Sequence, residues 1–266
     1  MLAVTTRNKL RSPRFFPAMV RAWLHVRQQL SRTPGMVRYI TGIAGLTEFY
    51  TLTLWESRAA MFNFTAGDGH RQMMWNFTRW SESFWAMRWC PTADALGAWG
   101  NTPLAESGCA AEPDDRHASP DWLARSPVME TLAPYIDTAG RPDKRDLNPT
   151  MCGVETVLAR MVTRSPLDVS RLMRAMHPWR SSPGLLRFAL GVGLGECLLV
   201  SLWRADGLED ARAWMQFVGE HFPNSWAMRL TAGDYEIGHW NDLRLRQMAA
   251  QRMRPLSHST RPMLQE

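Results

Sequence analysis

Two runs of alternating residues define the strand pattern of this chain. Residues 49–55 read FYTLTLW and residues 197–203 read CLLVSLW, and in a strand every second side chain shares a face. In each run one face is almost wholly aliphatic, whereas the other mixes Trp with Thr, Ser or Cys. We expect the aliphatic face to pack against helices. The mixed face is predicted to look into an interior pocket, and it includes Thr53, Trp55, Ser201 and Trp203.

A short motif that occurs twice indicates an internal repeat. SFWAMR at 83–88 recurs as NSWAMR at 224–229, and the earlier TPGMVRYITG at 33–42 recurs as SPGLLRFALG at 182–191. The G-x-W segments that follow the motif match as well, and they contain Gly97 and Trp99 in one copy and Gly238 and Trp240 in the other. Matched blocks in the same order indicate a duplication of roughly 100 residues per copy.

Both copies show the same order of local patterns. Extended runs are expected over 2–9, 36–43 and 47–55, and again over 155–163, 185–192 and 196–203. Helical spacing of apolar residues predicts helices over 14–31, 57–79, 167–178 and 207–221. The WAMR strand closes each copy, and the period alone leaves open which of its faces points inward. The order β-α-β-β-α-β is that of a ferredoxin-like unit, with both helices on one face of an antiparallel sheet.

Each such unit leaves one apolar sheet face bare, and two units in one chain can cover each other. We therefore predict an α+β fold of two tandem ferredoxin-like (βαββαβ) repeats packed sheet to sheet, with a pocket between the sheets. The predicted divisions are repeat 1 over residues 1–100, a connector with a short helix over 101–153, repeat 2 over 154–243 and a basic C-terminal tail over 244–266.

Composition and charge narrow the range of partners. A hydrophobic fraction of 45%, with 13 Trp and 17 Met, supports a folded core. Eight basic residues precede Glu48, the first acidic one, which raises nucleic acid or an anionic membrane as partners. These residues are spread along a predicted helix and strands without a nucleic-acid-binding motif, so we predict no nucleic-acid partner. A basic N-terminal helix that binds an acidic partner is the weakest hypothesis.

Other patterns bear on location and chemistry. The four cysteines lack C-x-x-C spacing and do not align between the copies, which favours a reducing cytoplasm. The apolar stretch 185–203 is interrupted by Arg187 and Glu196, and the first residues lack a signal-peptide pattern, so we expect a soluble protein without stable membrane insertion. The sequence has no P-loop, G-x-S-x-G or H-E-x-x-H motif, which leaves nucleotide-dependent and hydrolase functions unsupported.

Residues 54–92 carry a family resemblance. Trp-Glu-Ser, an apolar helix containing Phe64, then His70 and a strand ending in Trp and Pro resemble a block of the dimeric α/β-barrel superfamily, which includes antibiotic-biosynthesis monooxygenases. The duplicated layout and the G-x-W segments are similar to the spheroidene monooxygenase family, which oxidises carotenoids and is associated with haem. The resemblance implies an intramolecular dimeric α/β barrel with monooxygenase-like activity. Arg204 and Ala205 replace Glu-Ser in the second copy, which implies that only one half keeps a site.

His70 is the first candidate for chemistry. It follows Gly-Asp-Gly at an expected kink in the second helix, where an imidazole could face the pocket as a general base or, as the resemblance implies, an axial haem ligand. The alternative is a partly exposed loop histidine. His221 lies in a comparable place in the second copy and is the second candidate.

Four further residues, in two matched pairs, are candidates for substrate binding. Arg88 and Arg229 lie on apolar strands and need an anionic partner, which is either a ligand or, as we prefer, the matched Glu48 and Glu196. The matched Trp55 and Trp203 could stack on a flat ligand or belong to the ordinary core.

Two functions therefore remain open. The first is a monooxygenase-like enzyme that oxidises a hydrophobic small molecule of polycyclic, aromatic or isoprenoid type, with haem as the candidate cofactor. The second is a non-catalytic carrier or a cyclase-like protein for a pathway intermediate. The sequence allows a monomer or a homodimer in either case.

Overall fold

The computed structural model describes residues 1–100 and 153–245. The expected connector at 101–153 and the expected tail at 244–266 lie outside these ranges except for their edge residues. No helix in the described ranges is long and apolar enough to cross a membrane.

The first half of the chain forms four strands and three α-helices in the predicted order. The helix expected over 57–79 is broken in two at Ala66 and Gly67, because Gly67 takes an extended backbone conformation and starts a new helix. The elements are β1 (Leu2–Leu10), a 3-10 turn η1 (Pro13–Phe15), α1 (Phe16–Leu30), β2 (Met36–Ile43), β3 (Glu48–Trp55), α2 (Arg58–Thr65), α3 (Asp68–Trp80) and β4 (Ser81–Gly97).

The second half repeats this order with two α-helices in place of three. Ser165 precedes the first helix and donates its backbone N–H to Asp168, an N-terminal capping interaction. The elements are β5 (Val154–Val162), α6 (Pro166–Ala175), η3 (Trp179–Ser181), β6 (Leu185–Val192), β7 (Glu196–Arg204), η4 (Ala205–Gly207), α7 (Leu208–His221) and β8 (Trp226–Gly238).

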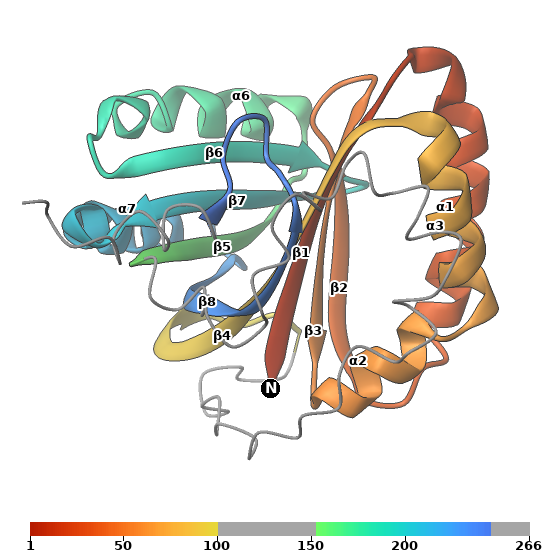
Figure 1. Ribbon diagram of the computed structural model, residues 1–266. Coiled ribbons are helices and arrows are strands. Elements are labelled where there is room, and N and C mark those ends of the chain that lie inside the picture. Colours follow the sequence, from red (N-terminus) through yellow and green to blue (C-terminus); the bar gives the residue numbers. More distant parts are fainter. Residues whose placement is uncertain (101–152, 246–266) are drawn as a thin grey trace, which may run out of the picture.

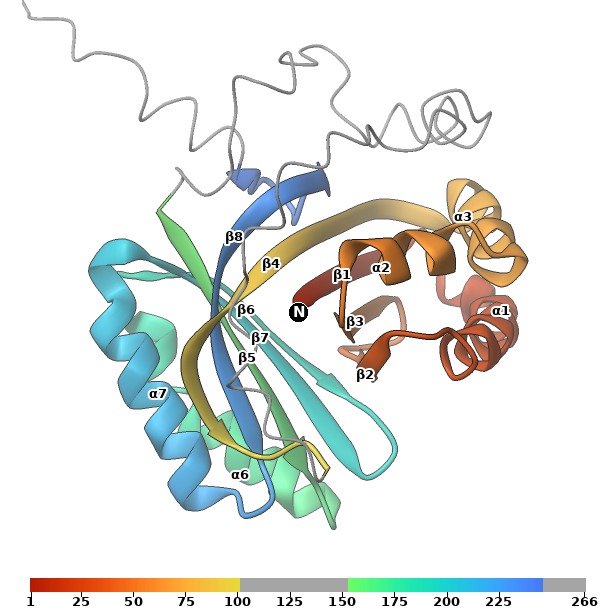
Figure 2. The same cartoon turned by 90° about the horizontal axis from the view of Figure 1, so that it is seen from below.

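The eight strands close into one antiparallel barrel in the order β1-β3-β2-β6-β7-β5-β8-β4. Within each half the strand order is that of a ferredoxin-like sheet. The helices lie outside the barrel, α1 to α3 over the first half and α6 and α7 over the second (Figures 1 and 2). The predicted fold class, two βαββαβ units in an intramolecular dimeric α/β barrel, is confirmed.

The glycines of the two G-x-W segments explain how the halves join. Along the β4–β8 edge, Gly97 pairs with Trp226 and Gly238 pairs with Trp85, so the contact is reciprocal. Both glycines have positive φ, +68° and +71°. A Cβ at Gly97 would lie 2.1 Å from the carbonyl oxygen of Ser225, and a Cβ at Gly238 would lie equally close to the opposite strand. Only glycine fits these two positions.

The tryptophans of the same segments turn back onto the motif. Trp99 packs on Trp226 and Trp240 packs on Trp85, each with ring centroids 5.2 Å apart. Each half therefore places a tryptophan against the WAMR strand of the other half. The repeated motif and the repeated tail form one symmetric contact.

The barrel interior is filled by side chains, which corrects the expected position of the pocket. The aliphatic faces of β3 and β7 point inward, and the mixed faces, with Thr53, Trp55, Ser201 and Trp203, point toward the helices. An eight-stranded barrel is just wide enough for its own side chains. The large residues of the WAMR strands occupy that space together with the aliphatic faces, and they include Trp85, Met87, Trp89, Trp226 and Met228.

Candidate functional site

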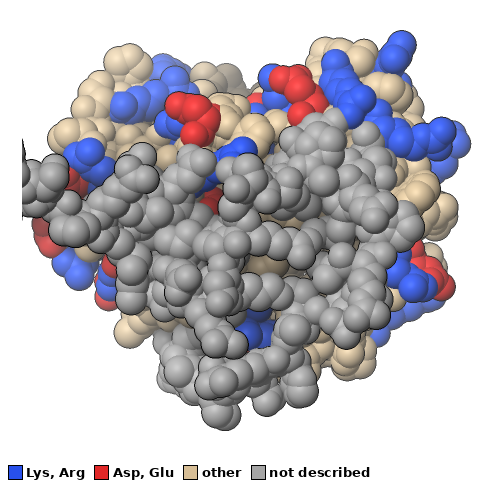
Figure 3. All heavy atoms as spheres, in the orientation of Figure 1, with Lys and Arg blue, Asp and Glu red and all other residues tan. Residues whose placement is uncertain are grey.

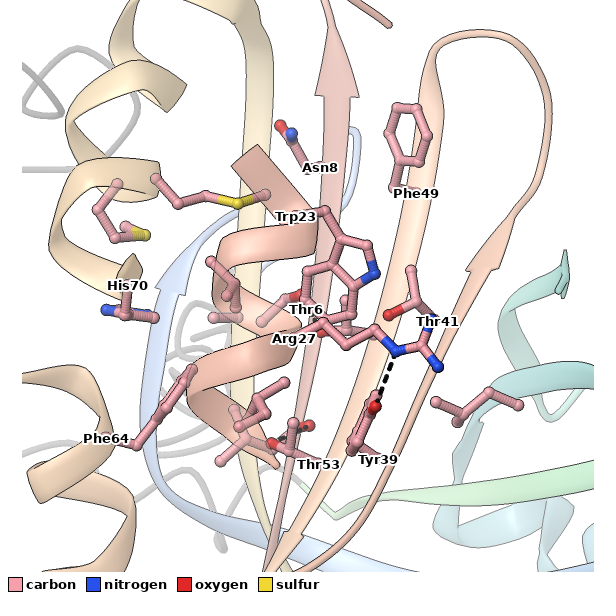
Figure 4. Close-up of a pocket in the computed structure, with 18 of the residues that line it drawn as sticks. Thr6, Asn8, Trp23, Arg27, Tyr39, Thr41, Phe49, Thr53, Phe64 and His70 are labelled. Atoms are coloured by element: carbon pink, nitrogen blue, oxygen red, sulfur yellow. Dashed lines mark hydrogen bonds between the residues drawn. The ribbon is translucent and has the colours of Figure 1, made fainter. Parts of the chain in front are cut away.

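A cavity of about 1090 Å³ lies in the first half, between the outer face of the sheet and helices α1 to α3 (Figure 4). Most of its wall is apolar, because the helices turn their hydrophobic sides toward the sheet. The wall residues of the helices include Met19, Trp23, Val26, Phe64, Met73 and Phe77.

The sheet gives the cavity a floor with a polar strip. Thr6, Thr51 and Thr41 are cross-strand neighbours on β1, β3 and β2, and all three line the cavity. The hydroxyls of Thr6 and Thr51 are hydrogen-bonded at 2.6 Å. In the next row, Thr53 accepts a hydrogen bond of 2.8 Å from Nε1 of Trp55. Residues two apart on one strand share a face, which is why these threonines gather.

Two polar atoms of this floor lack a partner among the described residues. The Oδ1 of Asn8 accepts a hydrogen bond of 2.5 Å from the hydroxyl of Ser81, but its Nδ2 has none. The hydroxyl of Thr41 also has none. Asn8 is only 4% exposed, and its neighbours across the strands are Phe49 and Phe84. A buried amide in aromatic surroundings is unfavourable unless something else pairs with it.

His70 lines the cavity at the start of α3. The Gln29 side chain of α1 bridges the break between the two helices: its Nε2 donates to the carbonyl of Phe64 at 2.6 Å and its Oε1 accepts from the backbone N–H of His70 at 2.9 Å. The ring lies edge-on to Phe64, and Nδ1 is 3.2 Å from the carbonyl of Thr65. That contact assigns the proton to Nδ1 and leaves Nε2 as an acceptor.

Burial controls the charge of this imidazole. It lowers the pKa of His70 from 6.5 to about 4, although the hydrogen bond to Thr65 acts in the opposite direction. His70 is therefore neutral near pH 7. Within the described residues, no group of three or more His, Cys, Asp and Glu side chains could hold a metal ion. A haem iron needs only one axial imidazole, and a neutral, oriented His70 fits that requirement.

The mouth of the cavity combines both halves of the chain. A Cβ at Gly42 would lie 2.5 Å from the backbone of Gly191, and this close approach brings the β6–β7 turn beside β2. Leu194 at the tip of that turn is 99% exposed and lines the mouth together with the exposed Leu24 of α1. Arg27 also lines the mouth and donates to the hydroxyl of Tyr39 at 3.1 Å.

The cations of the N-terminal segment lie mostly on the outside. Arg14 and Arg21 are exposed, and Figure 3 shows Lys and Arg side chains along the side of the molecule where α1 and α3 lie. These residues face solvent, as charged side chains of a surface helix do.

The corresponding space in the second half is filled. Trp214 of α7 is completely buried there and packs with Leu172, Met176 and Leu199 against the sheet. Counting back from the two WAMR runs, Trp214 corresponds to Met73 of the cavity wall, and Ala211 corresponds to His70. A larger side chain on the helix and apolar side chains on the sheet thus close the second site.

The structure brings together four of the residues singled out in the sequence. Thr53, Trp55, His70 and Arg88 all line the first-half cavity. The guanidinium of Arg88 lies 4.9 Å from the ring centre of Tyr235, a cation–π contact.

The other four lie elsewhere. Ser201 and Trp203 belong to the packed core of the second half, where the Ser201 hydroxyl donates to the Val157 carbonyl. His221 is at the exposed end of α7, stacked on Phe217. Arg229 binds Asp94 at 2.6 Å and also Glu155.

The expected ion pairs of Glu48 and Glu196 are therefore different from those observed. Glu48 binds Arg7 at 2.5 Å, and Glu196 binds Arg160 at 2.7 Å. The first pair links the neighbouring strands β1 and β3, and the second links β5 and β7. Arg7 and Arg160 occupy equivalent places on β1 and β5. The strand register, which the sequence does not reveal, decides which cation each carboxylate meets.

Comparison with known proteins gives a remote likeness. No protein family and no curated protein matches the chain. A solved structure named antibiotic biosynthesis monooxygenase is 13% identical, covering 33% of this chain and 95% of its own, with a TM-score of 0.31. A candidate monooxygenase from Lactobacillus acidophilus is 8% identical over 89% of this chain and 96% of its own, with a TM-score of 0.35. A cofactor-independent oxygenase from Streptomyces nogalater is 13% identical over 40% and 97%, with a TM-score of 0.29. Antibiotic-biosynthesis monooxygenases, which residues 54–92 resemble, thus recur among the structural neighbours, at a level that says nothing of activity.

Proposed function

We propose that the protein binds a hydrophobic small molecule in the first-half cavity and oxidises it as a monooxygenase does. The cavity itself carries this proposal. Ligand pockets have volumes of roughly 300–1000 Å³ and mostly apolar walls with a few polar groups. A cavity of about 1090 Å³ with such a wall suits a polycyclic or isoprenoid molecule.

The residues around the cavity have distinct roles in this proposal. Trp23 and Trp55 offer aromatic surfaces for a flat or conjugated ligand. Thr53 and Arg88 provide polar contact at one end of the floor. His70 presents Nε2 as an acceptor for a proton or a hydroxyl group of the substrate, or as the ligand of a haem iron. When bound, haem would supply the activation of dioxygen.

A non-catalytic carrier is the second candidate, and the pKa of His70 favours it. An imidazole with a pKa of about 4 is a weak base, which limits its use in proton abstraction near pH 7. The same neutral ring is well suited to accept a hydrogen bond from a ligand that is only carried.

Three measurements on the purified chain separate these outcomes. The first is the absorption spectrum before and after addition of haem. If His70 binds the iron, the wild type is expected to show a Soret band that a His70→Ala variant lacks. Oxygen uptake with polycyclic and isoprenoid compounds, followed by mass spectrometry for an added oxygen atom, tests oxidation.

A His221→Ala variant serves as the matched control, because that histidine lies outside the cavity. Binding without oxygen uptake would leave the carrier. Absence of binding for every hydrophobic compound would overturn both candidates.

A further inference from the structure

The two halves of the chain form an internal control for the cavity floor. They share one fold, so a residue needed for folding should have a counterpart of similar polarity in the other half. In the first half the cross-strand row is Thr6, Thr51 and Thr41. The same row in the second half is Ala159, Leu199 and Leu190.

Asn8 follows the same rule. It pairs with Phe49 across β1 and β3, and the equivalent pair in the second half is Met161 with Cys197. Met161 is completely buried. The fold thus accepts an apolar side chain at this position, and an amide in the first half is not a requirement of folding.

The polar residues of the floor also carry a cost that the protein itself does not offset. The Nδ2 of Asn8 and the hydroxyl of Thr41 lack partners among the described residues, whereas Leu190 and Met161 leave no polar group unsatisfied. Buried polar groups without a partner are unfavourable for stability. The closed second half also holds two such groups, Nε1 of Trp214 and Nε1 of Trp226. Asn8 and Thr41 differ from them because they line a cavity, where a ligand can complete their hydrogen bonds.

We infer that Asn8 and the threonine row form a recognition strip for an oxygen atom of the ligand. This inference rests on the proposed function and narrows its substrate class: the ligand is a hydrophobic molecule that carries a ketone, phenol or alcohol group, not a pure hydrocarbon. The hydroxyl of Thr41 donates to that oxygen. Asn8 lies two strands and two register positions from Thr41, so its Nδ2 is available to a second oxygen of the ligand. The apolar helices cover the rest of the molecule.

A pair of probes that differ in one oxygen atom tests the strip. Fluorenone is a ketone and fluorene is the matching hydrocarbon, and a larger pair, benzanthrone and benzanthrene, covers greater volume. Binding to the whole chain is measured by quenching of tryptophan fluorescence and by calorimetry. The wild type should bind each ketone more tightly than its hydrocarbon.

The Thr41→Val variant removes the hydroxyl at nearly constant shape. We expect about a fivefold loss of ketone affinity, the usual effect of one neutral hydrogen bond, and no loss for the hydrocarbon. Because the lost hydroxyl had no partner, the urea midpoint should stay the same or rise. An Asn8→Met variant, which copies the second half, should leave the affinity for these one-oxygen ketones unchanged, because Asn8 is too far from Thr41 to share their oxygen.

The matched control is Thr156→Val in the second half. The Thr156 hydroxyl is buried and donates to the carbonyl of Ser201 at 2.9 Å, far from the cavity floor. This variant should lower the urea midpoint and leave both affinities unchanged. Thr41→Val is therefore expected to weaken ketone binding without lowering the urea midpoint, whereas Thr156→Val is expected to lower the midpoint without weakening binding.

The outcomes distinguish the inference from the proposed function. If ketone and hydrocarbon bind equally, or if Thr41→Val weakens both to the same degree, the recognition strip is wrong and the hydrophobic cavity stands. If neither member of either pair binds, the proposed function fails and the strip fails with it.

Discussion

Acidification should destabilise the protein through His70. The folded state holds this imidazole neutral, with a pKa of about 4, whereas the unfolded chain binds a proton below about 6.5. The contribution of His70 to stability is therefore fully present above pH 6.5 and is lost as the pH falls toward 4. At 1.36 kcal/mol for each pH unit, the loss amounts to at most about 3 kcal/mol, since contact with solvent reduces it.

Urea unfolding at a series of pH values between about 7.5 and 4.5 measures this effect. In a His70→Asn variant the side chain can still donate to the Thr65 carbonyl but does not titrate, so its free energy of unfolding should fall less steeply below pH 6.5. His221→Asn is the matched control. His221 makes the same kind of contact to a backbone carbonyl and stacks on a phenylalanine, but it is exposed. Because that side chain is exposed in the folded state, the variant controls for the substitution itself. Equal slopes for wild type and His70→Asn would refute the assignment of a half-buried, neutral imidazole.

Two further pairs of substitutions test the reciprocal β4–β8 contact and the ion pairs of Glu48 and Glu196. Gly97→Ala and Gly238→Ala should each lower the free energy of unfolding by at least about 2 kcal/mol, because φ is positive at both positions and an added Cβ would make contacts of 2.1 Å and 2.0 Å. Unequal losses of stability in thermal unfolding, or no loss, would contradict the reciprocal β4–β8 contact. Glu48→Ala should cost about 3 kcal/mol by leaving Arg7, whose side chain is 2% exposed, without its carboxylate. Glu196→Ala, in the more exposed equivalent pair, should cost up to about 1 kcal/mol, and equal costs in urea unfolding would argue against the difference in burial.

The fold could be predicted from the sequence because the same order of strand, helix and turn patterns occurs in both copies. The matched WAMR runs and G-x-W segments fix the order of the strands, and the structure explains both motifs as one reciprocal contact. The break at Gly67 was expected only as a kink. It became two helices because Gln29, distant in sequence, satisfies the backbone groups at both helix ends.

The side of the sheet that carries the pocket could not be predicted. Alternation tells which residues share a face, but it does not tell which face lies inside the barrel. Thr53 and Trp55 were expected to face an interior pocket and instead line a cavity under the helices. The decisive facts are the bulk of Trp85 and Trp226 inside the barrel and the cavity that remains between α1 to α3 and the sheet.

Asn8 and Thr41 were missed, although the sequence contained a signal for them. Aligning the copies sets Asn8 against Met161 and Thr41 against Leu190, and a polar residue in one copy only marks the half that differs in function. The ion pairs had no such signal, because the partners of Glu48 and Arg229 depend on strand register and on Asp94 in the long β4 strand.

The number of hydrophobic ligands bound per chain tests the cavity most directly. Met73 lines the first-half cavity at the position that Trp214 fills in the second half, so a Met73→Trp variant should narrow it. Calorimetric titration with fluorenone is expected to give one site per wild-type chain and weaker binding by Met73→Trp, with unchanged circular dichroism. Two sites per wild-type chain, or full binding by the variant, would place the ligand outside this cavity and contradict the account.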